Sequence, residues 1–95
     1  MYQIVRTKDF ERSLKKIRRS GKFKTSTEES LLDAVHLLAA GKPLPTSYFD
    51  HKLHGQSGSY RECHIKGDLL LVYDLRDDIL VLVLVDIGSH SQLFK

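Results

Sequence analysis

The spacing of apolar residues changes from helical to strand-like about halfway along the chain. In the first half, Phe10, Leu14 and Ile17 recur at i, i+4 and i+7, which predicts one buried face of a helix. Thr7 is a good N-cap for this helix, and Ser20-Gly21 is a good stop. The segment after residue 7 is therefore expected to be an amphipathic helix.

A second helix is expected to follow. Its apolar stripe is formed by Leu31, Leu32, Val35, Leu38 and Ala39. Ser26, with Glu29 three residues later, predicts a capping box at its start, and Thr27 is a competing cap. Gly41 and Pro43 are expected to end it. The short link between the two helices favours an antiparallel helical hairpin.

Strand patterns flank the helices. Residues 2–6 predict a short opening strand, and residues 60–65, 69–75 and 79–85 predict three more. The expected turns are Lys66-Gly67-Asp68 and Arg76-Asp77-Asp78. Residues 42–59 are expected to be a loop, and residues 89–95 a turn or a short helix.

Alternation in the segment 60–65 assigns its side chains to two faces. Tyr60, Glu62 and His64 share one face, and Arg61, Cys63 and Ile65 share the other. The predicted order is β-α-α-β-β-β, which indicates a single α+β domain over residues 1–95, with a helical hairpin packed on a mainly antiparallel sheet. The last two strands are apolar on nearly both faces, so the face without helices must be covered by the chain or by a partner.

Composition fits one cytoplasmic domain. The chain has 95 residues and a single cysteine, Cys63, which excludes an intramolecular disulfide and fits a reducing compartment. No signal peptide is visible, and the most apolar stretch, residues 69–87, contains five charged side chains, which excludes a membrane span. Cys63 is expected to be a small core residue rather than a nucleophile.

The net charge of +3 hides an uneven distribution. Nine basic and two acidic side chains give residues 1–24 a charge of +7, and the remaining residues carry −4. The basic groups crowd into the first helix, at Lys15, Lys16, Arg18 and Arg19. Such a segment indicates a polyanion or an acidic partner, and the alternative is a solvated helix face that binds nothing.

Four of the five histidines lie beyond residue 50, at His51, His54, His64 and His90. Asp50 and Asp68 accompany them. Imidazoles exchange protons near neutrality, and a pair of them can cleave RNA without a metal. One takes the proton of the ribose 2′-hydroxyl, and the other protonates the departing 5′-oxygen. A zinc site is disfavoured because the only short ligand pair is His51-x-x-His54. His36 is expected to be a helix-flank residue.

Residues 50–94 resemble the YafQ toxins of the RelE/ParE superfamily. The resemblance rests on Asp50-His51-Lys52-Leu53-His54-Gly55, on Arg61-Glu62-Cys63-His64 with Asp68, on Leu71-Val72-Tyr73, and on Gly88-Ser89-His90-Ser91-Gln92-Leu93-Phe94. It implies an endoribonuclease that cuts messenger RNA at the ribosome, needs no metal or other cofactor, and is neutralised by a DinJ- or RelB-like antitoxin. The toxin–antitoxin complex could also bind its own operator DNA.

By position, the resemblance makes His51, His64, Asp68 and His90 the catalytic set and Phe94 the C-terminal aromatic. We expect His51 or His64 to be the general base and His90 the general acid. Asp68 would orient or tune a histidine. Phe94 could stack on a base or simply pin the tail.

Two positions depart from the family pattern. Leu69 replaces an aromatic, and Asp86 replaces an arginine that holds phosphate in the family. A carboxylate there would repel the scissile phosphate, so the positive charge is expected from Arg61, Lys52 or Lys66, or cleavage is weak. Arg61 could instead anchor the sheet.

Three functions fit these features of the sequence. The first is the ribosome-dependent nuclease, with the first helix lying against ribosomal RNA through Lys15, Lys16, Arg18 and Arg19. The second is a ParE-like toxin that binds DNA gyrase and cleaves nothing, which has no need of the histidines. The third is a weakened RNA-binding module, marked by Asp86.

Overall fold

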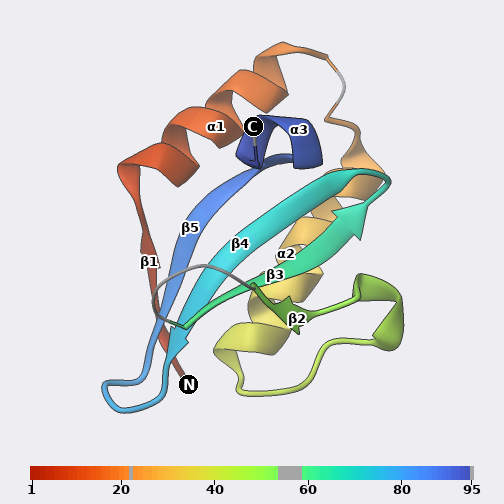
Figure 1. Ribbon diagram of the computed structural model, residues 1–95. Helices are drawn as coiled ribbons and strands as arrows, with labels where there is room; N and C mark the ends of the chain where they lie inside the picture. Colours follow the sequence, from red (N-terminus) through yellow and green to blue (C-terminus); the bar gives the residue numbers. More distant parts are fainter. Residues whose placement is uncertain (22, 54–58, 95) are drawn as a thin grey trace.

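The computed structural model describes residues 1–21, 23–53 and 59–94 (Figure 1). The helices are α1 (Lys8–Arg19), α2 (Thr25–Ala39), the 3-10 turn η1 (Thr46–Tyr48) and α3 (His90–Leu93). The strands are β1 (Gln3–Arg6), β2 (His51–Lys52), β3 (Tyr60–Lys66), β4 (Leu69–Arg76) and β5 (Val81–Ser89). None of the helices described is long and apolar enough to cross a membrane.

The strands form one sheet in the order β1-β5-β4-β3-β2. The pairs β2–β3, β3–β4 and β4–β5 are antiparallel, which confirms the predicted α+β class. β1 pairs in parallel with β5, from Gln3 opposite Val81 to Arg6 opposite Leu84. α1 and α2 cover one face of the sheet, and α3 lies at the end of β5 (Figure 1).

The core lies between the helical hairpin and the sheet, as the apolar stripes predict, except that Leu32 of the second stripe is 49% exposed and does not belong to it. Phe10 and Leu14 of α1 and Ala34 and Leu38 of α2 are buried in it. The strands contribute Cys63, Ile65, Leu71, Tyr73, Leu82, Leu84 and Ile87. Cys63 is completely buried, which confirms its predicted place in the core.

The start of α1 is joined to the sheet by its cap. The Thr7 hydroxyl oxygen accepts from the Phe10 amide at 3.0 Å, as predicted, and the same hydroxyl donates to the Val85 carbonyl at 2.7 Å. The register between β4 and β5 shifts beside this bond, because Val72 lies opposite Asp86 but Tyr73 lies opposite Leu84. Val85 is therefore the extra residue of a β-bulge.

The predicted start of the second helix is wrong. α2 begins at Thr25, and its N-cap, Lys24, makes no side-chain cap bond. The Lys24 carbonyl already accepts from the amides of Thr27 and Glu28. Ser26 therefore lies inside the helix and cannot act as its cap, so the capping box with Glu29 does not form.

Two loop predictions also need correction. Residues 42–59 contain η1 and β2, so His51 belongs to a strand and pairs with Glu62. Arg76 pairs with Val81, so the last hairpin turn spans residues 77–80 and is one residue longer than expected. Leu80 adopts a left-handed backbone there, with φ of 53°. β5 then continues to Ser89, beyond the predicted end at residue 85.

A partly buried polar network ties the segment before β2 to the sheet. The hydroxyl of Tyr73, which is only 1% exposed, donates to the Asp50 carboxylate at 2.5 Å. Arg61 Nε lies 3.3 Å from both the Asp50 carboxylate and the Tyr73 hydroxyl. Burial, and then the bond to Asp50, raise the pKa of Tyr73, so its hydroxyl keeps its proton and remains a donor.

We expect Tyr73→Phe to lower the free energy of unfolding by about 1–2 kcal/mol, because the Asp50 carboxylate loses a donor in a partly buried place. Urea unfolding followed by circular dichroism measures this change. Tyr48→Phe is the matched control, since its hydroxyl lies 3.5 Å from the Ser30 carbonyl and makes a weak bond at best. Equal losses in the two variants would contradict the role given to the network.

Candidate active site

Two of the predicted catalytic histidines lie on neighbouring strands around a buried carboxylate. His51 of β2 is directly opposite Glu62 of β3, and His64 follows two residues later on the same face of β3. The Glu62 Oε1 atom lies 3.4 Å from His51 Nε2 and 4.0 Å from His64 Nε2. The two imidazole rings are 6.5 Å apart between centroids. The Glu62 side chain is 6% exposed, whereas the imidazoles of His51 and His64 are 47% and 39% exposed.

The orientation of His51 is set by the residue that ends η1. Phe49 adopts a left-handed backbone with φ of 47°, and its carbonyl oxygen lies 2.7 Å from His51 Nδ1. A carbonyl can only accept, so Nδ1 carries the proton and Nε2 is the nitrogen that can take another. The Phe49 ring packs edge-on against the His64 ring, with centroids 5.4 Å apart. Phe49 therefore positions both histidines.

The other two members of the predicted set lie at the end of the sheet where β3 and β5 finish. Asp68 is in the turn between β3 and β4, and the next residue, Leu69, is opposite Ser89. Ser89 caps α3 through a capping box with Gln92. His90 is the first residue of α3, and its ring is 5.1 Å from that of Phe94.

Strand register relates these two groups. His64 is opposite Leu70, and Leu70 is opposite Gly88, two residues before His90. Neighbouring strands are about 4.8 Å apart, so the backbones at 64 and 88 are separated by about 10 Å. This span is comparable to one or two nucleotides, so the register is compatible with a shared RNA strand. The catalytic assignment itself stays a prediction.

The close approach of α3 to β5 leaves little space for a side chain at Gly88. A Cβ atom added at Gly88 would lie 3.0 Å from Gln92 Oε1 and 3.5 Å from Leu93. The small residue thus lets the short helix fold back against its own strand and keeps His90 near the end of the sheet.

Other predicted residues have different contacts. Arg61 belongs to the network with Asp50 and Tyr73, which matches sheet anchoring, the second of its two predicted roles. Lys52 and Lys66 are exposed and form no ion pair within the described part of the chain. The remaining candidate, His54, lies outside the described residues. Among those described, no group of three or more His, Cys, Asp and Glu side chains could hold a metal ion.

Asp86 makes contacts that the sequence did not predict. Its Oδ1 atom accepts from the Ser13 hydroxyl at 2.7 Å and from the Ile87 amide at 2.8 Å. The carboxylate therefore joins β5 to α1.

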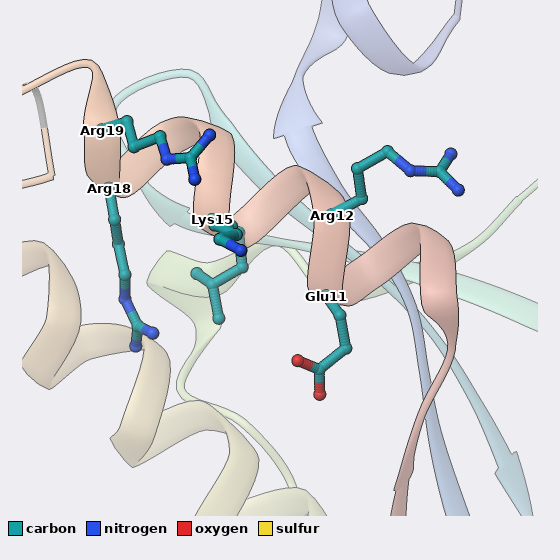
Figure 2. Close-up of a pocket in the computed structure, with 6 residues that line it drawn as sticks. Glu11, Arg12, Lys15, Arg18 and Arg19 are labelled. Carbon is teal, nitrogen blue, oxygen red and sulfur yellow. The ribbon is translucent and has the colours of Figure 1, made fainter.

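The basic face of α1 borders an open groove of about 740 Å³ (Figure 2). Arg12, Lys15 and Arg19 line it, together with Arg18. Arg18 points toward α2 and pairs with Glu28 at 2.5 Å. Arg12 lies 3.4 Å from Asp9, a long and exposed pair. Among the described residues that line the groove, only Lys15 and Arg19 are basic groups without a carboxylate partner.

Sequence reasoning missed Glu62 and Phe49. The alternation that put Tyr60, Glu62 and His64 on one face was a usable signal for Glu62. For Phe49 there was none, because its role depends on a left-handed backbone in a segment expected to be loop.

A family model described as a bacterial toxin of type II toxin–antitoxin system, YafQ, matches residues 2–95. The chain belongs to the YafQ family. An mRNA interferase toxin YafQ of Escherichia coli K12 is 40% identical over 52 residues, which cover 55% of this chain and 54% of that protein. The matches to the curated YafQ relatives span 54% to 62% of the relatives' lengths.

Solved structures of related toxins match the YafQ fold of this chain over nearly its whole length. A metal-bound toxin from Helicobacter pylori is 41% identical with a TM-score of 0.88, covering 99% of this chain and all of that one. A chain of the Escherichia coli DinJ–YafQ complex is 28% identical with a TM-score of 0.86, covering 100% of both. The family resemblance drawn from residues 50–94 is thereby confirmed.

We expect Cys63 to be inert in the folded protein. Burial, followed by the nearby carboxylates of Asp50 and Glu62, raises its pKa to about 12, so only about 1 in 10,000 molecules carries the thiolate at pH 8. Ellman's reagent should release almost no chromophore from native protein at this pH and one equivalent in denaturant. Rapid, full release from the native protein would contradict this burial.

Proposed function

We propose that this chain is the toxin of a toxin–antitoxin pair and cleaves ribosome-bound messenger RNA by general acid–base catalysis. The observation that carries the proposal is the pair of imidazoles, 6.5 Å apart, held on either side of the buried Glu62 carboxylate. Membership of the YafQ family and the name of the Escherichia coli relative, an mRNA interferase, support the same activity. A ribosome-bound substrate would place the protein in the cytoplasm.

The base would come from the pair formed by His51 and His64. The Phe49 carbonyl keeps the proton of His51 on Nδ1, so Nε2 accepts the proton of the ribose 2′-hydroxyl. The imidazolium that results is stabilised by the Glu62 carboxylate, 3.4 Å away. His64 is placed to play the same part or to donate to a phosphoryl oxygen.

The acid would be His90, with its second proton passing to the 5′-oxygen as the P–O bond breaks. The Phe94 ring beside it limits its orientation and offers a stacking surface for a base. Asp68 would orient the substrate or a histidine from the turn between β3 and β4. No metal is needed, because both proton transfers have an imidazole.

Two alternatives account for less of the site. A ParE-like gyrase toxin gives no reason for a buried glutamate between two histidines. The hypothesis of a decayed RNA-binding module depends on Asp86. The carboxylate of Asp86 accepts hydrogen bonds from Ser13 and Ile87. The position therefore has a structural use, which weakens it as a sign of lost catalysis.

The partner would be a DinJ-like antitoxin, since a related toxin is solved in complex with DinJ. We propose that its acidic groups dock on the groove of α1 through Lys15 and Arg19 (Figure 2). The same face could contact ribosomal RNA, in which case antitoxin and ribosome exclude each other. Binding of the complex to its operator DNA remains a separate expectation.

We expect His64→Ala and His90→Ala each to slow RNA cleavage by about 10²–10⁴ and to abolish growth inhibition, because His90 is the proposed acid and His64 belongs to the pair that supplies the base or holds the phosphate. The cleavage assay uses messenger RNA bound to programmed ribosomes, with parent and variants compared in the same buffer. His36→Ala is the control, since His36 is exposed on α2. Circular dichroism and the melting temperature should stay unchanged. Full cleavage by both variants would refute the site, and DNA damage on induction without loss of translation would favour the gyrase toxin.

We expect the double variant Lys15→Gln/Arg19→Gln to weaken antitoxin binding by about 10-fold at low salt and to flatten its dependence on ionic strength, because two exposed unpaired cations are lost. Titration calorimetry at several salt concentrations measures both effects. Lys24→Gln/Lys42→Gln carries the same charge change outside the groove and should bind like the parent. If the two double variants lose affinity equally, the groove is not the docking surface.

A further inference from the structure

We propose that a second cavity, between α1, the β3–β4 turn and α3, binds the nucleotide next to the bond that is cleaved. The cavity has a volume of about 400 Å³. Such a volume lies in the range of small-molecule sites and suits one nucleotide. The inference rests on the proposed nuclease function and names a subsite for its RNA substrate.

The walls of the cavity offer the two chemistries that a nucleotide needs. Lys16 of α1 and Lys66 of β3 line it with ammonium groups, and neither forms an ion pair with a described residue. Asp68 contributes one negative charge, so these three groups leave a net positive charge that favours a phosphate. Phe23 and Leu69 supply apolar surface for a base or a ribose.

The cavity adjoins the proposed catalytic residues. Asp68 lines it directly, and so does Ser89, the residue before His90. A phosphate held by Lys16 and Lys66 would therefore lie one linkage from the group that His90 protonates. In this arrangement, Asp68 lies between the nucleotide bound in the cavity and the nucleotide whose linkage is cleaved.

Lys16 differs in its surroundings from its neighbour Lys15. Lys15 lines the groove of Figure 2, whereas Lys16 lines this cavity and a smaller adjoining one of about 170 Å³ that includes Ser13 and Asp86. Lys16 is also one of the predicted ribosome contacts, and its place in this cavity adds a proposed role toward the substrate. It brings a cation close to position 86, where the carboxylate of Asp86 is bonded to Ser13 and Ile87.

The test measures binding of a 2′-O-methyl RNA hexamer, which has no 2′-hydroxyl and cannot be cleaved. We expect Lys16→Gln and Lys66→Gln each to raise its Kd by about 5- to 20-fold at low salt. Each should also reduce the slope of log Kd against log salt by about 0.7, the value for one lost phosphate contact on a single strand. Lys16→Arg, which keeps the charge, should bind within about twofold of the parent.

Two further variants distinguish binding in the cavity from non-specific electrostatic attraction of the RNA. Lys8→Gln removes a cation from the same helix. Because Lys8 does not line the groove of α1, this cavity or the smaller adjoining one, the variant should bind the hexamer within about twofold of the parent. Thr27→Trp fills the cavity from α2 without changing the charge, and it should weaken binding as much as Lys16→Gln. Parental affinity in Lys16→Gln, or in a folded Thr27→Trp, would overturn the proposal, as would an equal loss in Lys8→Gln.

Cleavage kinetics distinguish a failure of the subsite from a failure of the proposed function. Lys16→Gln should raise KM for RNA while His90→Ala lowers kcat. If His64→Ala and His90→Ala cleave normally, the nuclease site is wrong even where Lys16→Gln loses hexamer binding. If the histidines are essential for cleavage and Lys16→Gln keeps the parental KM, only the proposed nucleotide subsite is wrong.

Discussion

The hydrogen bond between Tyr73 and Asp50 connects the core of the sheet to the segment that presents His51. Tyr73 is fixed by packing under the helices, and Asp50 is the residue directly before β2. β2 is only two residues long and could not hold its register alone. The buried hydroxyl and the guanidinium of Arg61 secure it at one end, and pairing with β3 secures it along its side. The spacing of His51 and His64 depends on both.

Strand β3 contributes to both the core and the candidate site because successive side chains point to opposite faces of the sheet. Cys63 and Ile65 face the helices and pack in the core, whereas Glu62 and His64 face the other way and form the candidate site. A shift of one residue in the pairing would move the carboxylate into the core and the thiol to the surface. The same packing that holds the sheet together therefore determines which side chains the candidate site presents.

The sequence predicted the elements with strong periodicity and missed those that depend on tertiary contacts. The helix face at Phe10 and Leu14 and the strands from residue 60 onward followed from spacing alone. β2 is too short to have a period, and the start of α2 followed the backbone of Lys24 rather than the Ser26 side chain. In the site, the histidines were recognisable by type and motif. Glu62 acquires its role from the strand opposite it, and the bond of Asp86 to Ser13 joins residues far apart in the chain.

Helix α3 carries the proposed proton donor but none of its residues is buried. It is held by a serine cap and by the space that Gly88 leaves, and the hydrophobic core is complete without it. Inactivating changes in this helix would then carry almost no folding penalty. If the proposed function holds, one substitution in this helix would give an inactive chain that still folds and still binds the proposed antitoxin.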